Sequence, residues 1–200
     1  MPNIPILLLA AGSSSRMGTS KALLVWNQEP LILSRIQALK ATGQNVYVVL
    51  GASLNTIAPI LKNREVSICT NPQWEEGMST SIAFGVKSIR SQEQWIDGIL
   101  ITTIDQPLVD TSYLNAILAL YQKGHQQIIV SESDKGWRGV PALFDRHYLE
   151  ALSQLKGDTG AKEIVQTHPQ KVGVISGGEK LVDMDTPEMY ELLKKLTRQL

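Results

Sequence analysis

The sequence predicts a single-domain α/β protein, a three-layer αβα sandwich built on a mainly parallel sheet. Two observations carry this prediction. Short aliphatic runs without polar alternation are typical of strands that are buried on both faces. Segments with apolar residues at helical spacing separate most of these runs. Strands that alternate with helices in this way form parallel sheets with right-handed crossovers.

Five continuous runs are expected to form the buried strands. They are rich in Ile, Leu and Val, and each ends at glycine or at a small or polar residue, where a turn can begin. The runs are residues 6–9, 46–50, 66–70, 98–104 and 127–130.

Helices are expected between them. Leu31, Ile32, Arg35, Ile36 and Leu39 fall at helical spacing before Gly43. The further expected helices are a short one capped by Thr56 with Pro59 in its first turn, one over 77–90, and one marked by Leu114, Ile117, Leu118 and Tyr121.

The last third of the chain is less regular. Residues 140–144 resemble a strand, 146–155 a helix, and the turn 157–160 leads into a helix that starts near Ala161. Residues 171–175 and 180–184 are expected to pair as strands around Ser176-Gly177-Gly178. Thr186-Pro187 caps and opens the final helix.

Composition limits the classes of partner. The chain has 200 residues, enough for one sizeable domain, with 19 basic and 19 acidic residues. No net field therefore favours nucleic acid or an anionic membrane. The single cysteine, Cys69, excludes an internal disulfide and a cysteine-rich metal site, which suits a cytoplasmic location. The N-terminus lacks a cationic leader, and its apolar run is too short to span a bilayer.

The loop after the first strand is the strongest functional signal. Its residues 10–15 read A-A-G-S-S-S and carry almost no side-chain bulk, so a ligand can approach the backbone N–H groups. Arg16 and Lys21 add positive charge beside them. A triphosphate fits such a site best, although any αβ turn after a first strand favours glycine and serine.

Two commoner glycine loops do not match. A Walker loop requires G-x-x-x-x-G-K-[ST], whereas Gly12 and Gly18 are six apart and Lys21 follows three residues later. A dinucleotide fingerprint requires G-x-G-x-x-G and an acidic residue after the second strand, where this chain has Gly51.

Asp105 follows the apolar strand 98–104, at the sheet edge where open αβ sheets bind ligands. A carboxylate opposite a polyphosphate cradle can hold Mg²⁺ on the phosphate oxygens. The alternative is a turn-capping role next to Pro107. The phosphate loop favours the metal role.

Asp183 and Asp185 are two apart in V-D-M-D-T-P, and on a strand they would point to one face. Either aspartate can complete a metal site. Asp185 can also assist Thr186 at the start of the last helix, where negative charge is favoured. For Asp185, the metal-binding role and the helix-capping role are evenly balanced. For Asp183, a structural role without metal binding is favoured.

Four motifs in order resemble one family. These motifs look like those of the MobA-like NTP transferases, nucleotidyltransferases related to the enzymes that attach a nucleotide to molybdopterin; they are A-A-G-S-S-S-R-M-G-T-S-K, N-P-Q-W-E-E-G-M-S-T-S, D-Q-P and D-M-D-T-P. G-M-S-T-S is similar to the molybdenum cofactor cytidylyltransferase branch. Ala11 stands where the guanylyltransferase branch usually has glycine. The resemblance implies a Rossmann-like fold of the nucleotide-diphospho-sugar transferase type.

The resemblance also implies roles for residues. Arg16, Lys21 and Asp105 are implied to be catalytic, with Asp105 and Asp185 as ligands of Mg²⁺. The implied nucleotide-binding residues are Leu9, Ala10, Ala11, Gly12, Ser13, Arg16, Lys21, Asn71, Gly77, Ser81 and Asp105. Arg138 and Lys162 are implied to bind the acceptor. Residues 1–110 would mainly bind nucleotide and 131–180 mainly the acceptor. Close relatives often have histidine where this chain has Val140, a departure that concerns the identity of the acceptor.

The implied reaction is Mg²⁺-dependent transfer of CMP from CTP to a phosphorylated acceptor of the molybdopterin type, with release of pyrophosphate. A molybdoenzyme or its chaperone is a further implied partner. The alternatives are a GTP-using molybdopterin guanylyltransferase, a sugar-1-phosphate nucleotidyltransferase, or a nucleotide-sensing or cofactor-carrier module without catalysis.

Overall fold

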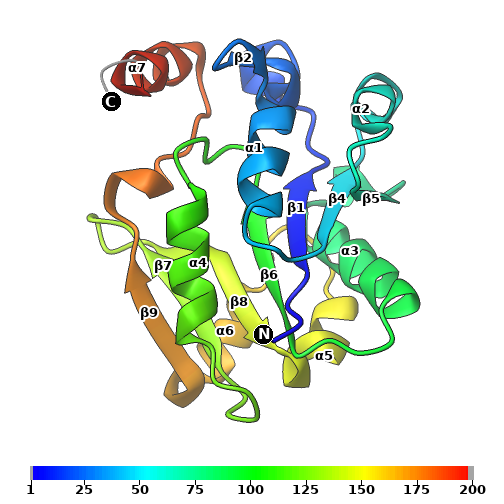
Figure 1. The fold of residues 1–200 in the computed structure, drawn as a ribbon, viewed down its shortest axis with the longest axis vertical. Helices are drawn as coiled ribbons and strands as arrows, with labels where there is room; N and C mark the ends of the chain where they lie inside the picture. Colours follow the sequence, from blue (N-terminus) through cyan, green and yellow to red (C-terminus); the bar gives the residue numbers. More distant parts are fainter. Residues whose placement is uncertain (1, 198–200) are drawn as a thin grey trace.

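The computed structural model describes residues 2–197 and confirms the α/β fold class (Figure 1). Seven strands form one sheet in the order β5-β4-β1-β6-β8-β7-β9. β8 runs antiparallel to its neighbours β6 and β7, and the other neighbouring pairs are parallel. The strands are β1 (Ile6–Ala10), β4 (Val46–Leu50), β5 (Ser67–Thr70), β6 (Gly98–Thr103), β7 (Ile128–Glu132), β8 (Arg138–Asp145) and β9 (Val172–Ser176).

Helices cover both faces of this sheet, as the three-layer prediction requires. Alternate residues of β1 enter two separate cores, Leu8 with α1, α2 and α4, and Leu7 with α3, α5 and α6. The first group is α1 (Leu31–Lys40), α2 (Leu54–Leu61) and α4 (Thr111–Leu120). The second group is α3 (Met78–Gln92), α5 (Leu149–Ser153) and α6 (Lys162–Thr167).

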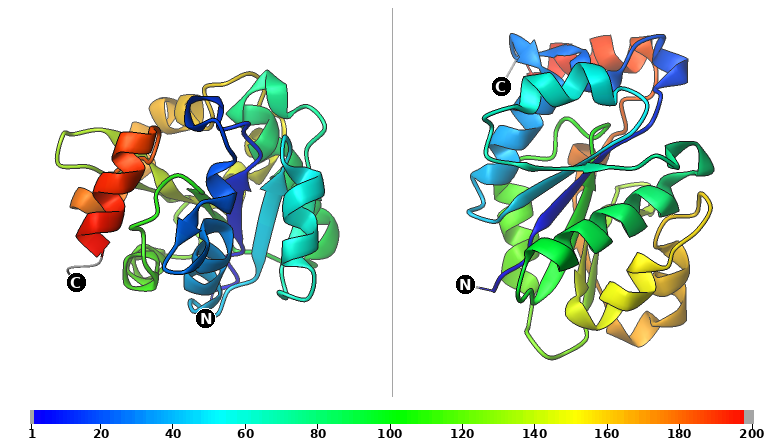
Figure 2. Two further views of the ribbon diagram at one scale, coloured as in Figure 1. Left: turned by 90° about the horizontal axis from the view of Figure 1, so that it is seen from above. Right: turned by 90° about the vertical axis from the view of Figure 1, so that its right-hand side faces the viewer.

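The C-terminal helix α7 (Pro187–Thr197) lies beyond the carboxyl ends of the strands, beside a small hairpin of β2 (Val25–Trp26) and β3 (Glu29–Pro30) (Figures 1 and 2). The Tyr190 hydroxyl donates to the Val25 carbonyl at 2.7 Å, which ties helix to hairpin. Thr186 accepts from the Met189 N–H at 3.3 Å, so it caps this helix as predicted.

Strand register places three loops together. Leu9 in β1 is opposite Val49 in β4 and Thr103 in β6. Because the three strands are parallel, the loops that follow them leave from the same edge of the sheet. These loops begin near residues 11, 51 and 104.

The predicted pairing of 171–175 with 180–184 is wrong. β9 instead joins the sheet edge in parallel with β7, and residues Gly178–Leu181 form a 3₁₀ turn. A parallel partner was already present at the edge of the sheet, and Leu181 and Met184 are buried against the core rather than placed in a hairpin. The local alternation of apolar residues carried no information about that partner.

Two helix starts also differ from the prediction. Helix α2 begins at Leu54, so Thr56 does not cap it and Pro59 lies inside it. Pro59 removes the N–H that would bond to Asn55, an exposed position where water can replace the lost partner. The expected helix over 146–155 is split into a 3₁₀ turn, Arg146–Tyr148, and the short α5. Across residues 2–197, no helix combines the length and apolar character needed to cross a membrane.

The buried carboxylate of Asp97 lies at the amino end of β6, opposite the end of the sheet from which the three loops leave. Asp97 accepts hydrogen bonds from the Asn3 N–H at 3.0 Å and from Trp95 Nε1 at 3.1 Å, and its carboxylate lies 2.7 Å from Lys123 Nζ. Burial alone would raise the pKa of Asp97, but these donors outweigh burial and hold the pKa below its usual value. Asp97 is only 5% exposed, so its ionised form depends on these partners.

We predict that Asp97→Ala lowers the free energy of unfolding by about 2–4 kcal/mol at pH 7, because it leaves buried donors without an acceptor. A carboxyl group with a lowered folded-state pKa stabilises the fold above its unfolded pKa and loses this effect as pH falls through the folded pKa. The difference between variant and wild type therefore shrinks below about pH 4. Urea unfolding at pH 7 and pH 3 measures it, and an equal difference at both pH values would contradict the assignment.

Candidate active site

The loop after β1 presents backbone at the surface. Ala10 and Ala11 are buried, whereas Gly12 and Ser13 are exposed, and a Cβ at Gly12 would meet no atom within 4 Å. Ser14 adopts a left-handed conformation, and its hydroxyl accepts from the Lys21 N–H at 3.1 Å. This bond closes the loop, so that its backbone and Lys21 belong to one structure.

Lys21 joins this loop to two distant carboxylates. Its Nζ lies 2.5 Å from Asp185 Oδ1 and 3.7 Å from Asp105 Oδ2, and its side chain is 11% exposed. Arg16 is much more exposed and lies 3.8 Å from the other oxygen of Asp185. The structure thus brings together the predicted catalytic residues Arg16, Lys21 and Asp105 with the predicted metal ligand Asp185.

The C-terminal segment reaches the site without forming the expected strand. The Met184 N–H donates to the Asp105 carbonyl at 2.7 Å, and the Met184 side chain is fully buried. Asp183 and Asp185 flank this anchor. Gln106 Nε2 donates to Asp183 at 3.1 Å, whereas Asp185 faces Lys21. The segment is therefore not a strand, but both aspartates lie near Asp105, on either side of the buried Met184.

Negative charge accumulates at this edge. Loss of hydration, together with the charges of Asp105 and Asp185, raises the pKa of Asp183 to about 6. Its bond from Gln106 and the nearby Lys21 act in the opposite direction. An edge whose carboxylates repel one another in this way favours the binding of a cation.

The residues present fit a hard divalent cation. Asp105 Oδ1 is buried and has no hydrogen-bond partner among the described residues. Residues 2–197 contain no group of three or more His, Cys, Asp or Glu side chains that could hold a metal ion. Mg²⁺, however, usually takes only one or two protein carboxylates and fills the remaining positions with phosphate oxygens and water. Asp105 and Asp185 are suited to that limited role.

A second predicted segment forms a buried polar network. Asn71 Nδ2 donates to the hydroxyl oxygens of Thr80 and Ser81, both at 3.0 Å, and Asn71 Oδ1 accepts from the Gln73 N–H at 2.8 Å. Asn71 is 1% exposed. These bonds give Asn71 a role in shaping the start of α3. Its direct contact with a nucleotide stays a prediction.

Gly77 connects that segment to the loop at 157–160. Its φ of +111° and the 2.7 Å distance from a built Cβ to Asp158 Cα leave no room for a side chain. The Ser79 N–H donates to the Gly157 carbonyl at 3.1 Å, and the Ser79 hydroxyl accepts from the Gly160 N–H at 2.9 Å. The sequence analysis did not select Ser79 as a functional residue, although its position in G-M-S-T-S was a signal for it.

The two predicted acceptor residues lie outside the Lys21 cluster, which consists of Arg16, Lys21, Asp105 and Asp185. Arg138 begins β8, is exposed, and binds Glu132 Oε1 at 2.7 Å. Lys162 begins α6 and is exposed. Neither makes a hydrogen bond or salt bridge to Lys21, Asp105 or Asp185 within the described part of the chain.

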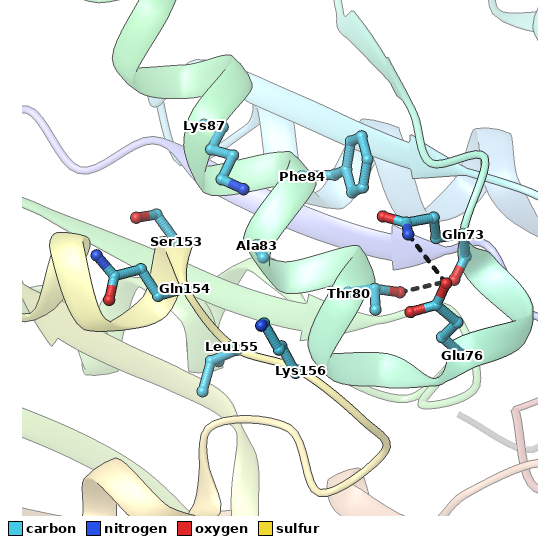
Figure 3. A pocket seen from close by; sticks show the side chains of 10 residues that line it. All are labelled: Gln73, Glu76, Thr80, Ala83, Phe84, Lys87, Ser153, Gln154, Leu155 and Lys156. Atoms are coloured by element: carbon cyan, nitrogen blue, oxygen red, sulfur yellow. Dashed lines mark hydrogen bonds between the residues drawn. The ribbon is translucent and has the colours of Figure 1, made fainter.

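A cavity of about 690 Å³ lies between α3 and the segment at 153–156 (Figure 3). Phe84, Lys87 and Lys156 line it, together with Thr80, which the buried Asn71 contacts. None of the predicted catalytic, nucleotide-binding, acceptor-binding or metal-binding residues lines it, although Gln73, Glu76 and Thr80 belong to the motif at 71–81. The polar atoms suited to a metal-bound triphosphate lie instead at the carboxyl edge of the sheet.

A small-residue loop, two cations and facing carboxylates at the edge of a parallel sheet are features of a nucleotide-binding transferase. The sequence profile of the MobA-like NTP transferase domain matches residues 6–172. The chain belongs to this family and is a nucleotidyltransferase.

Relatives align over nearly their whole lengths. The purine catabolism protein PucB of Bacillus subtilis is 32% identical over 94% of this chain and 95% of its own. The nicotine blue oxidoreductase of Paenarthrobacter nicotinovorans is 28% identical, with coverages of 96% and 98%. The molybdenum cofactor cytidylyltransferase of Escherichia coli is 24% identical, with coverages of 98% and 97%.

Solved structures agree with the fold. A nucleotidyl transferase from Methanothermobacter thermautotroptrophicus superposes with a TM-score of 0.81 at 21% identity, covering 98% of both chains. Rv0371c from Mycobacterium tuberculosis, in a complex with manganese, gives 0.76 at 20% identity and covers 96% of this chain and 98% of its own.

We predict that Asp183→Asn stabilises the metal-free protein at neutral pH. A carboxyl group whose folded-state pKa is raised to about 6 weakens the fold as pH rises from about 4 through 6. The variant removes this charge and keeps an oxygen for Gln106. In EDTA, its Tm should exceed that of wild type at pH 7.5, and the gain should decrease toward pH 4. Glu191→Gln, an exposed change on α7, is the control, and a gain independent of pH would contradict the prediction.

Proposed function

We propose that this protein transfers CMP from CTP to a phosphorylated acceptor of the molybdopterin type and releases pyrophosphate, with Mg²⁺ as its divalent cation. The observation that carries the proposal is the contact of Lys21 with both Asp105 and Asp185 beside the loop after β1. The name of the Escherichia coli relative supports the choice of CTP and acceptor. The manganese complex of a structural neighbour is in keeping with a divalent cation.

In the proposed reaction, an oxygen of the acceptor phosphate attacks the α-phosphorus of CTP in line. A new P–O bond forms while the bond from the α-phosphorus to the bridging oxygen breaks, and pyrophosphate leaves with the electron pair. An acceptor phosphate is already ionised at neutral pH, so no general base is required. The protein acts by positioning the reactants and neutralising charge.

Lys21 supplies a fixed positive charge for oxygens that gain charge in the transition state. Its burial strengthens this effect because little water screens it. Arg16, which is exposed, binds the outer phosphates. When bound, the divalent cation neutralises phosphate charge, and Asp105 and Asp185 are the residues that would hold it.

We assign nucleotide binding mainly to residues 1–110 and acceptor binding mainly to 131–180. In the first part, the backbone of Leu9 to Ser13 contacts the base and phosphates, and the network of Asn71, Gly77 and Ser81 shapes the base and ribose pocket. In the second part, Arg138 and Lys162 bind acceptor anions. The hydrogen bonds of Ser79 with Gly157 and Gly160 support this proposal, since they bring the proposed nucleotide-binding and acceptor-binding parts into direct contact.

The reaction is tested by incubating the protein with each of the four NTPs, Mg²⁺ and molybdopterin, and measuring pyrophosphate. We expect release with CTP that depends on both acceptor and Mg²⁺. Preference for GTP would contradict the choice of base. Release only with a sugar 1-phosphate would contradict the acceptor, and NTP binding without release from any pair would contradict catalysis.

We predict that Asp105→Ala lowers kcat by about 10²-fold or more, because it removes a ligand of the cation that stabilises several kcal/mol of charge. The fold should remain intact, since the change removes no apolar core volume. Pyrophosphate release and circular dichroism measure the two properties. Glu65→Ala, which removes an exposed carboxylate paired with Lys40, is the control and should keep full activity. Near wild-type turnover of Asp105→Ala would refute the metal role.

A further inference from the structure

Arg35 is a buried cation on the core side of α1. It is 2% exposed and lies among Ile32, Ile36 and Leu39, which are all core residues. NH1 donates to the Val109 carbonyl, whereas Nε and NH2 have no partner among the described residues. Burial lowers the pKa of Arg35 to about 10, so the guanidinium group remains charged at neutral pH.

Such a residue is unfavourable for stability alone. A buried charge without a direct carboxylate partner loses hydration that its remaining contacts replace poorly. No salt bridge of Arg35 occurs within residues 2–197. An apolar side chain of similar length would fill this part of the core without that cost. Residues that break a packing rule in this way are expected where function requires them.

The segment that Arg35 contacts is the loop between β6 and α4, which carries Asp105. Thr111, just after this loop, donates from its hydroxyl to the Ala38 carbonyl of α1 at 2.9 Å. On the other side, the Met184 N–H binds the Asp105 carbonyl. The loop is therefore held between α1 and the C-terminal segment, with the guanidinium group of Arg35 on the α1 side.

Other unpartnered polar atoms gather on the same part of the chain. They are Thr102 Oγ1, Thr103 Oγ1, Asp105 Oδ1 and Gln106 Oε1. All four are oxygens that can accept hydrogen bonds. The negative charges of Asp110 and Asp105 raise the pKa of Arg35 and so partly offset the effect of burial. A fixed cation thus lies behind the end of β6 and the loop that follows it, which carries the carboxylates of Asp105 and Asp110.

We propose that Arg35 is a positioning residue, which holds the loop at 105–110 from behind so that Asp105 is oriented toward a divalent cation and its nucleotide. Lys21 contacts Asp105 from the side of the phosphate loop, whereas Arg35 does not reach the substrate and acts through the loop backbone and its charge. The nature of the ligand rests on the proposed function. The positioning of the loop does not.

The test compares Arg35→Met with Arg35→Lys. The matched control is Arg90→Met, which removes an exposed arginine near the C-terminal end of α3 that is paired with Glu150 of α5. Calorimetry measures Mn²⁺ binding in the presence of a CTP analogue with a methylene bridge between the α- and β-phosphates. Thermal unfolding and amide hydrogen exchange are measured on the same samples.

For Arg35→Met we expect an unchanged or raised Tm, faster exchange confined to residues 105–110, and Mn²⁺ affinity weakened about 10- to 100-fold. Arg35→Lys keeps the charge without the planar group and should recover part of the affinity. Arg90→Met should bind Mn²⁺ as wild type does. This combination separates positioning from a structural role, which would lower Tm and affinity together.

Unchanged Mn²⁺ affinity in Arg35→Met would overturn the inference, and so would faster exchange spread over the whole chain with a lowered Tm. A wild-type protein that binds no Mn²⁺ with the analogue would refute the proposed function instead. In that case the positioning role is decided by the exchange of residues 105–110. Local acceleration in Arg35→Met supports it, and an unchanged rate overturns it.

Discussion

The ion pairs of Lys21 with Asp105 and Asp185 are the interaction on which the candidate site depends. They connect three parts of the chain that are far apart in sequence: the loop after β1, the end of β6 and the segment before α7. Lys21 is almost buried, so its charge needs these carboxylates, and the carboxylates repel one another without it. In the proposed reaction, a cation with its phosphates would use the same carboxylates, so one cluster would serve both stability and binding.

The parallel sheet makes this cluster possible. β4, β1 and β6 end in register, so the loops at 11, 51 and 104 leave from one edge. Gly51 allows close approach there, because a Cβ would lie 2.5 Å from the Trp74 side chain and 2.7 Å from the Ala11 carbonyl. The Ala52 N–H donates to the same carbonyl at 3.0 Å. The loop after β1 is therefore held by contacts with neighbouring segments as well as by hydrogen bonds within the loop.

The two halves of the proposed site are joined through α3. Its first residues contact the loop at 157–160, while Asn71 orders Thr80 and Ser81 from the preceding segment. Relatives with names as different as a purine catabolism protein and a molybdenum cofactor cytidylyltransferase align with this chain over almost their whole lengths. Arg138 and Lys162, which we propose to bind the acceptor, are exposed and make no hydrogen bond or salt bridge to Lys21, Asp105 or Asp185 in the described part of the chain.

The sequence by itself determined the fold class, the five strands β1, β4, β5, β6 and β7, and the residues that meet at the site. It did so because buried parallel strands are continuous aliphatic runs, and because Asp105 and the loop at 10–16 both follow such strands. Only the tertiary structure decided that 180–184 is not a strand, since β9 pairs with β7 rather than with its neighbour in sequence. It also decided which aspartate faces Lys21 and that Arg35 lies buried behind Asp105. These features arise from contacts between segments distant in sequence, and local patterns of hydrophobicity and charge do not encode such contacts.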